Sequence, residues 1–161
     1  MKTVALLFLA PTLIGAQEVS IKVAQLPPEV RAAVTKRFPN APMTGASRET
    51  EDGKTFYEVS IKLNGKNVDI TATPGAELTL IEREMAKKEL PAAVLQLIDA
   101  KYPKAKYNMV EDVSTVSATG ETLSYYEVLI TDSKKEKWEL QIALDGSRIL
   151  KVEKKKPGDV N

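Results

Sequence analysis

Carboxylates are almost the only side chains in this sequence that are suited to acid–base or ligand chemistry. The chain has 22 Asp and Glu residues but neither histidine nor cysteine, which removes thiol catalysis, serine–histidine catalysis and the usual zinc ligand sets. A first cluster, Glu49, Glu51 and Asp52, stands directly before Gly53. A calcium-binding loop needs more oxygen ligands, at alternate positions around its glycine. We therefore interpret this cluster as a turn.

A second pair of carboxylates, Glu58 and Glu127, occupies matching positions in two similar segments, Phe56–Ile61 and Tyr125–Ile130. Each segment offers one carboxylate, and nothing in the sequence brings the two together as a paired acid and base would require. We expect both to face solvent opposite lysines across a sheet, where such a pair contributes about 0.2–1 kcal/mol. The sequence thus predicts no catalytic residue, no metal ligand and no cofactor, and a protein that is not an enzyme.

These segments belong to a tandem repeat. The stretch Leu26–Ala41 (LPPEVRAAVTKRFPNA) returns without a gap at residues 90–105 as LPAAVLQLIDAKYPKA, which indicates a duplicated structural unit. In each copy, apolar residues three or four apart form the single stripe of a short amphipathic helix. Prolines bound this helix: Pro27 and Pro91 suit its first turn, whereas Pro39 and Pro103 stop it after an aromatic residue.

Four strands are expected after each helix. Alternating apolar and polar residues predict strands over residues 43–49, 55–62, 68–72 and 78–82, and again over 108–113, 125–130, 138–144 and 149–153. Asn64-Gly65 is typical of a type I′ hairpin turn between two of them. The predicted fold class is α+β, with two tandem repeats that each pack one short helix on a four-stranded antiparallel sheet. If the two sheets join or abut, about eight strands result.

The chain divides into five predicted parts. They are a signal peptide (1–16), a lead-in with extended character (17–25), the first repeat (26–89), the second repeat (90–153) and a disordered tail (154–161). Residues 84–89 contain neither glycine nor proline and make a poor flexible linker. We therefore expect the two repeats to be held against each other.

The first 16 residues have the pattern of a secretory signal. Lys2 precedes the apolar run Val4–Ile14, and small residues lead up to Gln17, where we expect the mature protein to begin. About a dozen apolar residues, interrupted by Pro11, fall short of the ~20 that a spanning helix needs. The sequence therefore predicts a periplasmic or secreted protein without stable membrane insertion.

The charge of the chain is nearly balanced, with 23 Lys and Arg against 22 Asp and Glu. Nucleic-acid binding relies on a net basic surface, so we expect no nucleic acid as a partner. The one basic run, Lys154 to Lys156, is interpreted as a solvated end of the chain.

Alternation along the strands assigns residues to two faces of the sheet. The helix side should bury Val30, Val34, Phe38, Tyr57, Val59 and Ile61, and their equivalents Val94, Ile98, Tyr102, Tyr126, Val128 and Ile130. The opposite face carries the candidate partner-binding residues Phe56, Glu58, Tyr125, Glu127 and Leu129. A one-sided helix layer leaves this face uncovered, and exposed apolar patches often mark interfaces. The alternatives are closure of a sheet edge and packing of one repeat on the other.

Three motifs give the chain a resemblance to a known family. They are Leu-Pro-x-x-Val ending in Phe/Tyr-Pro-x-Ala, the strand with an aromatic residue before Tyr-Glu-Val, and the closing segment Asp145–Glu153. Over residues 26–153 the chain resembles the PepSY-like, or β-lactamase-inhibitor-like, proteins of bacterial envelopes. The tandem arrangement is similar to the secreted β-lactamase inhibitor protein, whose concave sheet grips an enzyme, and related PepSY domains are thought to restrain peptidases. That inhibitor has disulfides and additional helix in each repeat, which this chain lacks, and none of its contact loops matches here.

The resemblance and the residues together lead to one functional hypothesis. The protein is expected to be an exported, non-catalytic protein-interaction module of the bacterial envelope, inhibitor-like toward a peptidase or another enzyme. Its partner would be an envelope or extracellular protein, and the sequence indicates no oligomeric state. The alternative is an envelope protein that binds a small molecule or a cation through its carboxylate-bearing faces.

Overall fold

The computed structural model describes residues 17–155 and contains one antiparallel sheet in which nine strands lie side by side in chain order. The strands are β1 (Gln17–Ile21), β2 (Met43–Glu51), β3 (Lys54–Leu63), β4 (Lys66–Ala72), β5 (Leu78–Glu84), β6 (Lys106–Ser117), β7 (Gly120–Thr131), β8 (Lys137–Ala143) and β9 (Ile149–Lys154). The two predicted four-stranded sheets are thus joined through β5 and β6, and the lead-in adds β1 as a ninth strand. The predicted signal peptide lies outside the described residues.

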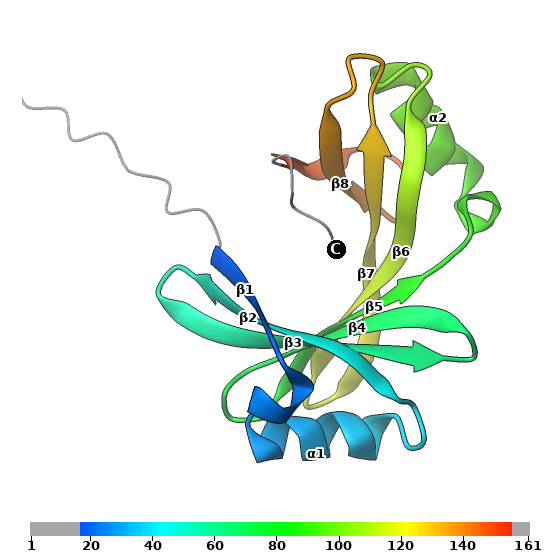
Figure 1. The fold of residues 1–161 in the computed structure, drawn as a ribbon. Coiled ribbons are helices and arrows are strands. Elements are labelled where there is room, and N and C mark those ends of the chain that lie inside the picture. The colour runs from blue at the N-terminus through cyan, green and yellow to red at the C-terminus, as the bar shows by residue number, and fades with distance from the viewer. Residues whose placement is uncertain (1–16, 156–161) are drawn as a thin grey trace, which may run out of the picture.

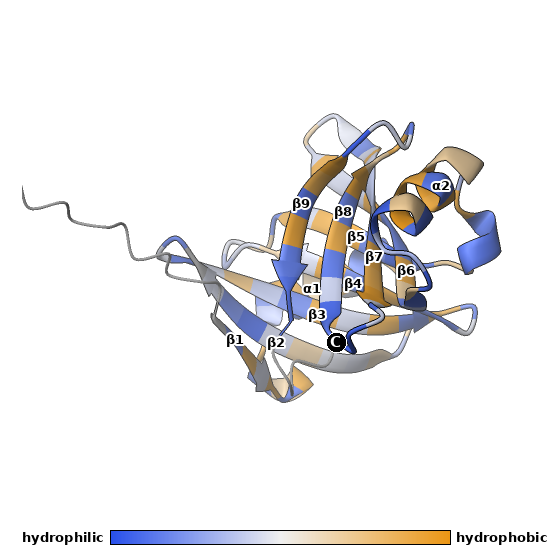
Figure 2. Cartoon of the chain, turned by 90° about the horizontal axis from the view of Figure 1, so that it is seen from above, coloured by the Kyte–Doolittle hydropathy of each residue, from blue (hydrophilic) through white to orange (hydrophobic). Residues whose placement is uncertain are grey.

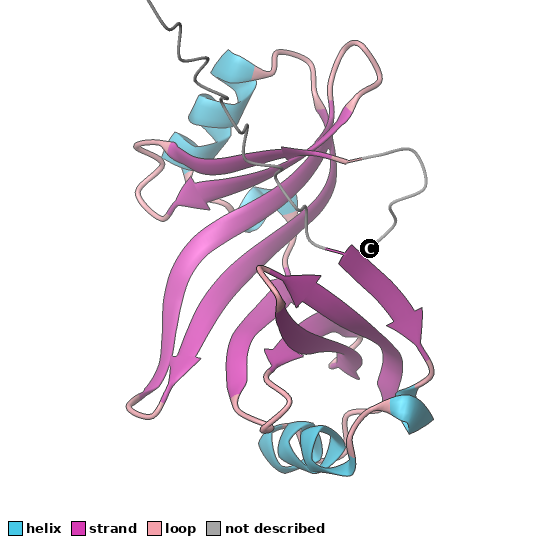
Figure 3. Cartoon of the chain, turned by 90° about the vertical axis from the view of Figure 1, so that its left-hand side faces the viewer, coloured by secondary structure: helices cyan, strands magenta, loops and turns pink. Residues whose placement is uncertain are grey.

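Both α-helices cover the same face of this sheet. Helix α1 (Pro28–Arg37) lies against the strands of the first repeat, and α2 (Ala92–Lys101) against those of the second. The pairing of Ile81 with Ser114 and of Arg83 with Asp112 carries the helix-bearing face across the junction between the repeats. The sheet curves away from the helices, so its helix-free face is concave (Figures 1 and 3).

The two helices begin and end as the prolines predict. Pro27 and Pro91 precede the first helical residue, where a missing N–H leaves no helical acceptor unsatisfied. At the other end, the N–H groups of Phe38 and Tyr102 donate the last helical hydrogen bonds, to Val34 and Ile98 at 2.8 and 2.7 Å. Short 3₁₀ turns, Val23–Gln25 and Lys87–Glu89, lead into the helices. The second of these fills the segment that we predicted to be a poor flexible linker.

Each repeat has its own hydrophobic core between its helix and the sheet. Val30, Val34, Val59 and Ile61 are at most 1% exposed in the first core, and Val94, Ile98, Val128 and Ile130 are 0% exposed in the second. Phe38 is also buried, but Tyr57, Tyr102 and Tyr126 are only partly buried and pack against the edges of the cores. The prediction of full burial was wrong for these three tyrosines, because a phenol oxygen favours a position at the boundary of the core. The alternation behind these assignments is visible along the strands in Figure 2.

The turn between β8 and β9 approaches the second helix closely at Gly146. This residue has φ +69°, and a Cβ atom there would lie 2.6 Å from the backbone carbon of Ala93 and 2.7 Å from the backbone nitrogen of Val94. Any larger residue would be strained by its φ and would collide with backbone atoms. Gly146 therefore allows the last hairpin to pack against the start of α2.

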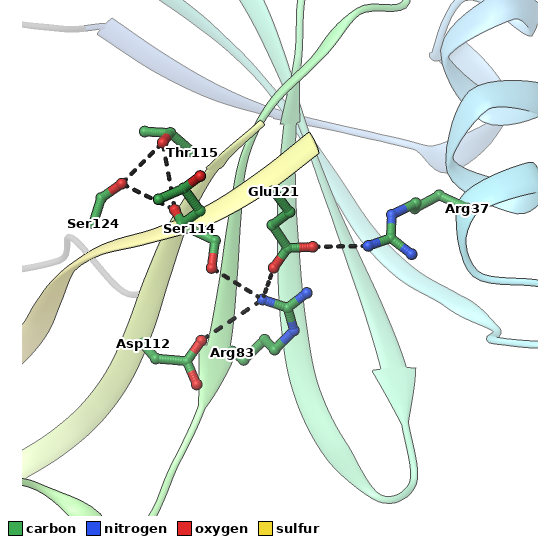
Figure 4. A network of polar contacts seen from close by, with 8 residues as sticks. Arg37, Arg83, Asp112, Ser114, Thr115, Glu121 and Ser124 are labelled. Carbon is green, nitrogen blue, oxygen red and sulfur yellow. Dashed lines mark hydrogen bonds and ion pairs between the residues drawn. The ribbon is translucent and has the colours of Figure 1, made fainter. Parts of the chain in front are cut away.

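An ion-pair network ties the second repeat to the first on the helix-bearing face. The long β6–β7 hairpin places Glu121 between two arginines of the first repeat, 2.6 Å from Arg83 and 2.7 Å from Arg37 (Figure 4). Arg83 also lies 3.7 Å from Asp112 and donates to the Ser114 hydroxyl at 3.4 Å. Hydrogen bonds from Arg83 lower the pKa of Glu121 and so keep it ionised. The two repeats are therefore held together by strand pairing and by charge.

Candidate functional site

The five predicted partner-binding residues all lie on the helix-free face. In β3, Phe56 pairs with Glu49 of β2 and Glu58 pairs with Ser47. In β7, Tyr125 pairs with Val113 of β6, Glu127 with Glu111, and Leu129 with Met109. Phe56, Glu58, Tyr125 and Leu129 are half-buried, whereas Glu127 is buried. The structure thus brings the five residues onto one concave surface that spans both repeats.

Carboxylates, more than aromatic rings, dominate this surface. We define the acidic face by six residues that the helix-free side presents from six successive strands, β3 to β8. They are Glu58, Asp69, Glu82, Glu111, Glu127 and Glu139. Each directly adjoins a core residue in the sequence, so the alternation that buries Val59, Ile70 or Leu140 necessarily turns its acidic neighbour to the opposite side.

Crowding and burial keep several of these carboxyls protonated near neutral pH. Burial, with the charges of Asp69, Glu18 and other carboxylates, raises the pKa of Glu58 to about 8. Burial and the charges of Glu127 and Glu111 raise the pKa of Glu82 to about 9. The pKa of Glu111 rises to about 8 and that of Glu127 to about 7, again with burial as the largest cause. A protonated carboxyl avoids most of the cost of a buried charge and can donate a hydrogen bond.

Glu58 and Glu127 do not face lysines in solvent as we expected. The cross-strand neighbours of Glu58 are Ser47 and Thr71, and those of Glu127 are Glu111 and Gln141. Glu127 is only 6% exposed and accepts a hydrogen bond from the Gln141 amide at 3.2 Å. The expectation was wrong because the strand register, which periodicity does not define, places hydroxyl, carboxyl and amide side chains opposite these two residues in place of lysines. The charge of Glu127 also contributes to the raised pKa of Glu58, although nothing in the sequence had indicated that these two carboxyls interact.

The acidic face contains a groove over the first repeat. Its volume is about 440 Å³, and it is lined by Ser47, Glu58, Ser60, Asp69, Glu82, Glu84 and Glu111 together with residues of β1, β2 and β6. The Ser47 side chain is buried, with the residue 5% exposed, and its Oγ atom has no hydrogen-bond partner. Buried hydroxyls are nearly always hydrogen-bonded. The groove thus contains a polar atom whose bonding capacity is unused.

The chemistry of this surface favours binding of positive charge. Within residues 17–155 no three carboxylates stand close enough to form a metal-binding group. The same range contains no helix that is long and apolar enough to cross a membrane. Carboxyls with raised pKa values can act as general acids, but the chain supplies no histidine or cysteine to work with them. What the arrangement offers directly is a set of oxygen acceptors for a cationic N–H group.

Sequence reasoning missed most of the acidic face. Asp69, Glu82, Glu111 and Glu139 were not singled out, although each adjoins an alternating apolar residue just as Glu58 adjoins Val59. That adjacency was the signal that could have identified them. The expected solvated tail also needs correction, because Lys154 ends β9 and Lys155 lies 2.5 Å from buried Glu139. Residues 156–161 of that tail lie outside the described part of the chain.

Solved structures similar to this chain share its fold. A "putative periplasmic" protein of Bacteroides eggerthii matches with a TM-score of 0.62 and 20% identity, over 80% of this chain and 88% of its own. A DUF2874 family protein of Bacteroides uniformis matches with a TM-score of 0.61 and 19% identity over the same shares. A protein of Bacteroides fragilis described as BLIP-like matches with a TM-score of 0.57 and 21% identity, over 84% and 92%. At these identities the likeness shows a common fold.

No curated protein matches the chain. A family model, however, matches it twice in succession, over residues 12–81 and 76–151, which confirms the tandem repeat and the predicted family. The model is described as "Putative beta-lactamase-inhibitor-like, PepSY-like". The chain belongs to this PepSY-like family.

Proposed function

We propose that this protein is a periplasmic, non-catalytic module that binds another protein on its helix-free face. The single observation that carries the proposal is the concave face itself, which both repeats build and which neither helix covers. Half-buried Phe56, Tyr125 and Leu129 on this face offer apolar contact area within an acidic surround. Protein interfaces commonly combine such anchors with a polar rim.

The family supports this assignment. Of the solved structures that share the fold, the one from Bacteroides eggerthii is described as "putative periplasmic" and the one from Bacteroides fragilis as BLIP-like. A predicted export signal in residues 1–16 agrees with a periplasmic site of action. We further propose that the bound protein is an enzyme and that binding restrains it, as the inhibitor-like family description suggests.

A non-catalytic role is supported by the residues that the chain has available. Histidine and cysteine are absent from the sequence, and the described residues contain no group of carboxylates that could hold a metal ion. The crowded carboxyls of the acidic face are held protonated by burial and by one another. A cationic group that reaches them favours their ionised form, so their arrangement supports recognition of positive charge more directly than turnover of a substrate.

Capture of proteins from the native periplasm by immobilised protein tests the proposal. The double variant Phe56→Ala with Tyr125→Ala removes two rings from the helix-free face, and we expect it to lose a specific partner that the wild-type protein retains. The matched control is Val19→Ala with Leu123→Ala, because both residues are 41% exposed and register places both on the helix-bearing side. Equal capture by all three proteins would place the binding site elsewhere.

The identity of the captured protein then tests the finer proposal. If it is an enzyme, its turnover should fall when stoichiometric wild-type protein is added and should recover with the double variant. An unchanged turnover with wild-type protein bound would retain the interaction and reject inhibition.

Binding of a small molecule or a simple cation is the second candidate, supported by the acidic groove and its unpartnered Ser47 hydroxyl. A ligand that binds the folded state raises the melting temperature by mass action. A melting scan with calcium, magnesium and a set of small organic cations tests this alternative. A saturable rise with any one of them, and no captured protein, would favour it.

A further inference from the structure

The two repeats carry equivalent sets of three carboxylates on the helix-free face. In the first repeat, β3, β4 and β5 supply Glu58, Asp69 and Glu82, and in the second repeat β7, β8 and β9 supply Glu127, Glu139 and Glu153. The register is the same in both sets: Asp69 pairs with Glu82 as Glu139 pairs with Glu153, and Glu58 lies opposite Thr71 as Glu127 lies opposite Gln141. We call these the first and the second carboxylate triad.

A lysine of the chain itself lies against the second triad and offsets part of its charge. The Lys155 ammonium lies 2.5 Å from Glu139 and 4.0 Å from Glu153, with its side chain only 18% exposed. Burial alone would lower the pKa of Lys155, but the hydrogen bond to Glu139 and the charges of Glu139, Glu153 and Glu127 raise it overall. The second triad is thus a site that holds an ammonium group.

The first triad has no such lysine, because the two repeats differ in the residue at the equivalent position. Lys155 lies two residues after Glu153, and the equivalent residue two after Glu82 is Glu84. No ion pair within residues 17–155 involves Glu58, Asp69 or Glu82. The charges that act on Glu58 and Glu82 all come from other carboxylates. The first repeat therefore carries a fourth acidic residue, Glu84, at the position where the second repeat carries Lys155.

An open groove leads to the first triad. Glu58, Asp69, Glu82 and Glu84 line the groove of about 440 Å³, together with Ser47. The Ser47 residue is 5% exposed, and its hydroxyl oxygen has no partner. This hydroxyl is independent of the carboxylates in its chemistry, and it offers one further acceptor for an incoming N–H group.

We propose that the first triad receives a lysine or arginine side chain of a bound protein, in the way that the second triad receives Lys155. Charge complementarity selects this occupant, because every ionisable side chain that lines the groove is acidic. The absence of a metal-binding group among residues 17–155 argues against a bare metal ion. This inference rests on the proposed protein-binding role of the same face, and it names the chemistry of the partner's contact.

A basic peptide provides the direct probe. Hexalysine amide is titrated into the full chain at pH 8, and backbone amide shifts are followed by NMR. We expect saturable shifts in the strands that carry Ser47, Glu58, Asp69 and Glu82. The same peptide with acetylated side chains should give none. Shifts that are absent, or that lie on the helix-bearing face, would overturn the proposal.

The decisive variant is Glu84→Lys, which places an ammonium where the second repeat has Lys155. The new lysine should occupy the first triad from within and weaken hexalysine binding about tenfold or more. The control Glu29→Lys makes the same charge change on exposed α1, on the other side of the sheet. It should change affinity by less than about twofold, because a distant charge is screened by salt. Equal weakening by both variants would reduce the effect to net charge and reject the site.

A replacement variant and competing free cations test the remaining interpretations of the groove. The Glu84 carboxylate accepts a hydrogen bond from the Asn67 N–H at 3.1 Å, and Glu84→Lys removes this bond. If that variant does not fold, Asp69→Asn with Glu82→Gln takes its place, because it removes two charges and keeps the shape of the site. Butylammonium that binds as tightly as hexalysine, or calcium that displaces the peptide stoichiometrically, would assign the groove to a free cation and overturn the peptide assignment. Retained periplasmic capture by a Glu84→Lys protein that no longer binds hexalysine would reject this inference alone. Failure of the wild-type protein to capture any partner would instead reject the proposed function.

Discussion

The two repeats are alike on the helix-bearing face and differ on the other. Val59 and Val128 occupy equivalent strand positions, and both are 0% exposed beneath their helices. On the helix-free face the two carboxylate triads are also equivalent, but Lys155 in the second repeat corresponds to Glu84 in the first. Equal cores therefore coexist with a different charge balance on the helix-free face, which means that the requirements of the fold and those of that face are separable in this protein.

The largest expected effect is a loss of stability as pH rises. The carboxyls of Glu58, Glu82 and Glu111 have pKa values of about 8 to 9 in the folded protein, raised mainly by burial, against an ordinary value of 4.5. A group whose folded pKa is raised stabilises the folded state fully below its unfolded pKa and loses that contribution as pH rises through the folded pKa. Between pH 5 and pH 9 we expect the free energy of unfolding to fall by several kcal/mol, since each such carboxyl can contribute up to roughly 1.4 kcal/mol per pH unit below its folded pKa.

Urea unfolding at both pH values measures this change. Five acidic groups outside the first triad also raise the pKa values of its carboxyls, namely Glu18, Glu49, Glu84, Glu111 and Glu127. The Glu121 carboxyl, whose pKa is lowered chiefly by the hydrogen bond that Arg83 donates, acts in the opposite direction, and its contribution to stability is lost as pH falls below its ordinary pKa of 4.5. Glu58→Gln with Glu82→Gln should remove much of the loss at high pH, and Glu139→Gln with Glu153→Gln should not. Equal stability of the wild-type protein at pH 5 and pH 9 would contradict the raised pKa values.

The next effect tests the equality of the two cores. Val59→Ala and Val128→Ala should each lower the free energy of unfolding by about 1–3 kcal/mol, through lost burial and a residual cavity. Because both residues are 0% exposed in equivalent settings, the two losses should be similar. Chemical denaturation of each variant provides the measurement. A loss below a few tenths at both positions would mean that the assigned strand faces are wrong.

A smaller effect should follow from removal of the internal lysine. Lys155→Ala leaves Glu139, which is 8% exposed, without its ammonium partner, and it should cost about 1–2 kcal/mol at pH 7 because a buried acceptor loses a charged hydrogen bond. Lys151→Ala is the matched control, since the Lys151 side chain is 53% exposed in its pair with Glu153. Exposed pairs of this kind contribute little. Similar melting temperatures for both variants would show that the contact of Lys155 with the second triad does not stabilise the folded protein.

The sequence predicted the elements better than the surface they form. The helix stripe from Val30 to Phe38 and the turn at Asn64-Gly65 depend on local periodicity and local φ preferences, and the structure confirms both, with φ of +52° and +83° at the turn. The acidic face depends instead on which strands become neighbours. Glu111 lies beside Glu127 through the pairing of β6 with β7, but it lies beside Glu84 only because β5 pairs with β6 and joins the repeats into one sheet.

Lys155 shows the same limit at the end of the chain. A run of three lysines normally indicates a solvated segment, and composition alone cannot show that β9 directs the second of them toward Glu139. The tyrosines show a finer limit. Alternation placed Tyr57 and Tyr126 on the correct side of the sheet, but not their depth, since both are only partly buried against the cores. Face assignments can thus be read from periodicity, whereas partners across strands and degrees of burial need the assembled fold.

The smallest expected effect concerns the aromatic residues of the helix-free face. Phe56 and Tyr125 are half-buried and lie across the sheet from the cores, so replacing both with alanine should lower the free energy of unfolding by less than about 1 kcal/mol. Chemical denaturation beside Val59→Ala, which truncates a fully buried residue in the same strand as Phe56, makes the contrast direct. A loss equal to that of Val59→Ala would mean that the rings support the fold, as packing between repeats would require. Lost partner capture would then be a consequence of instability, whereas a stable variant that captures nothing would leave the helix-free face as the binding surface.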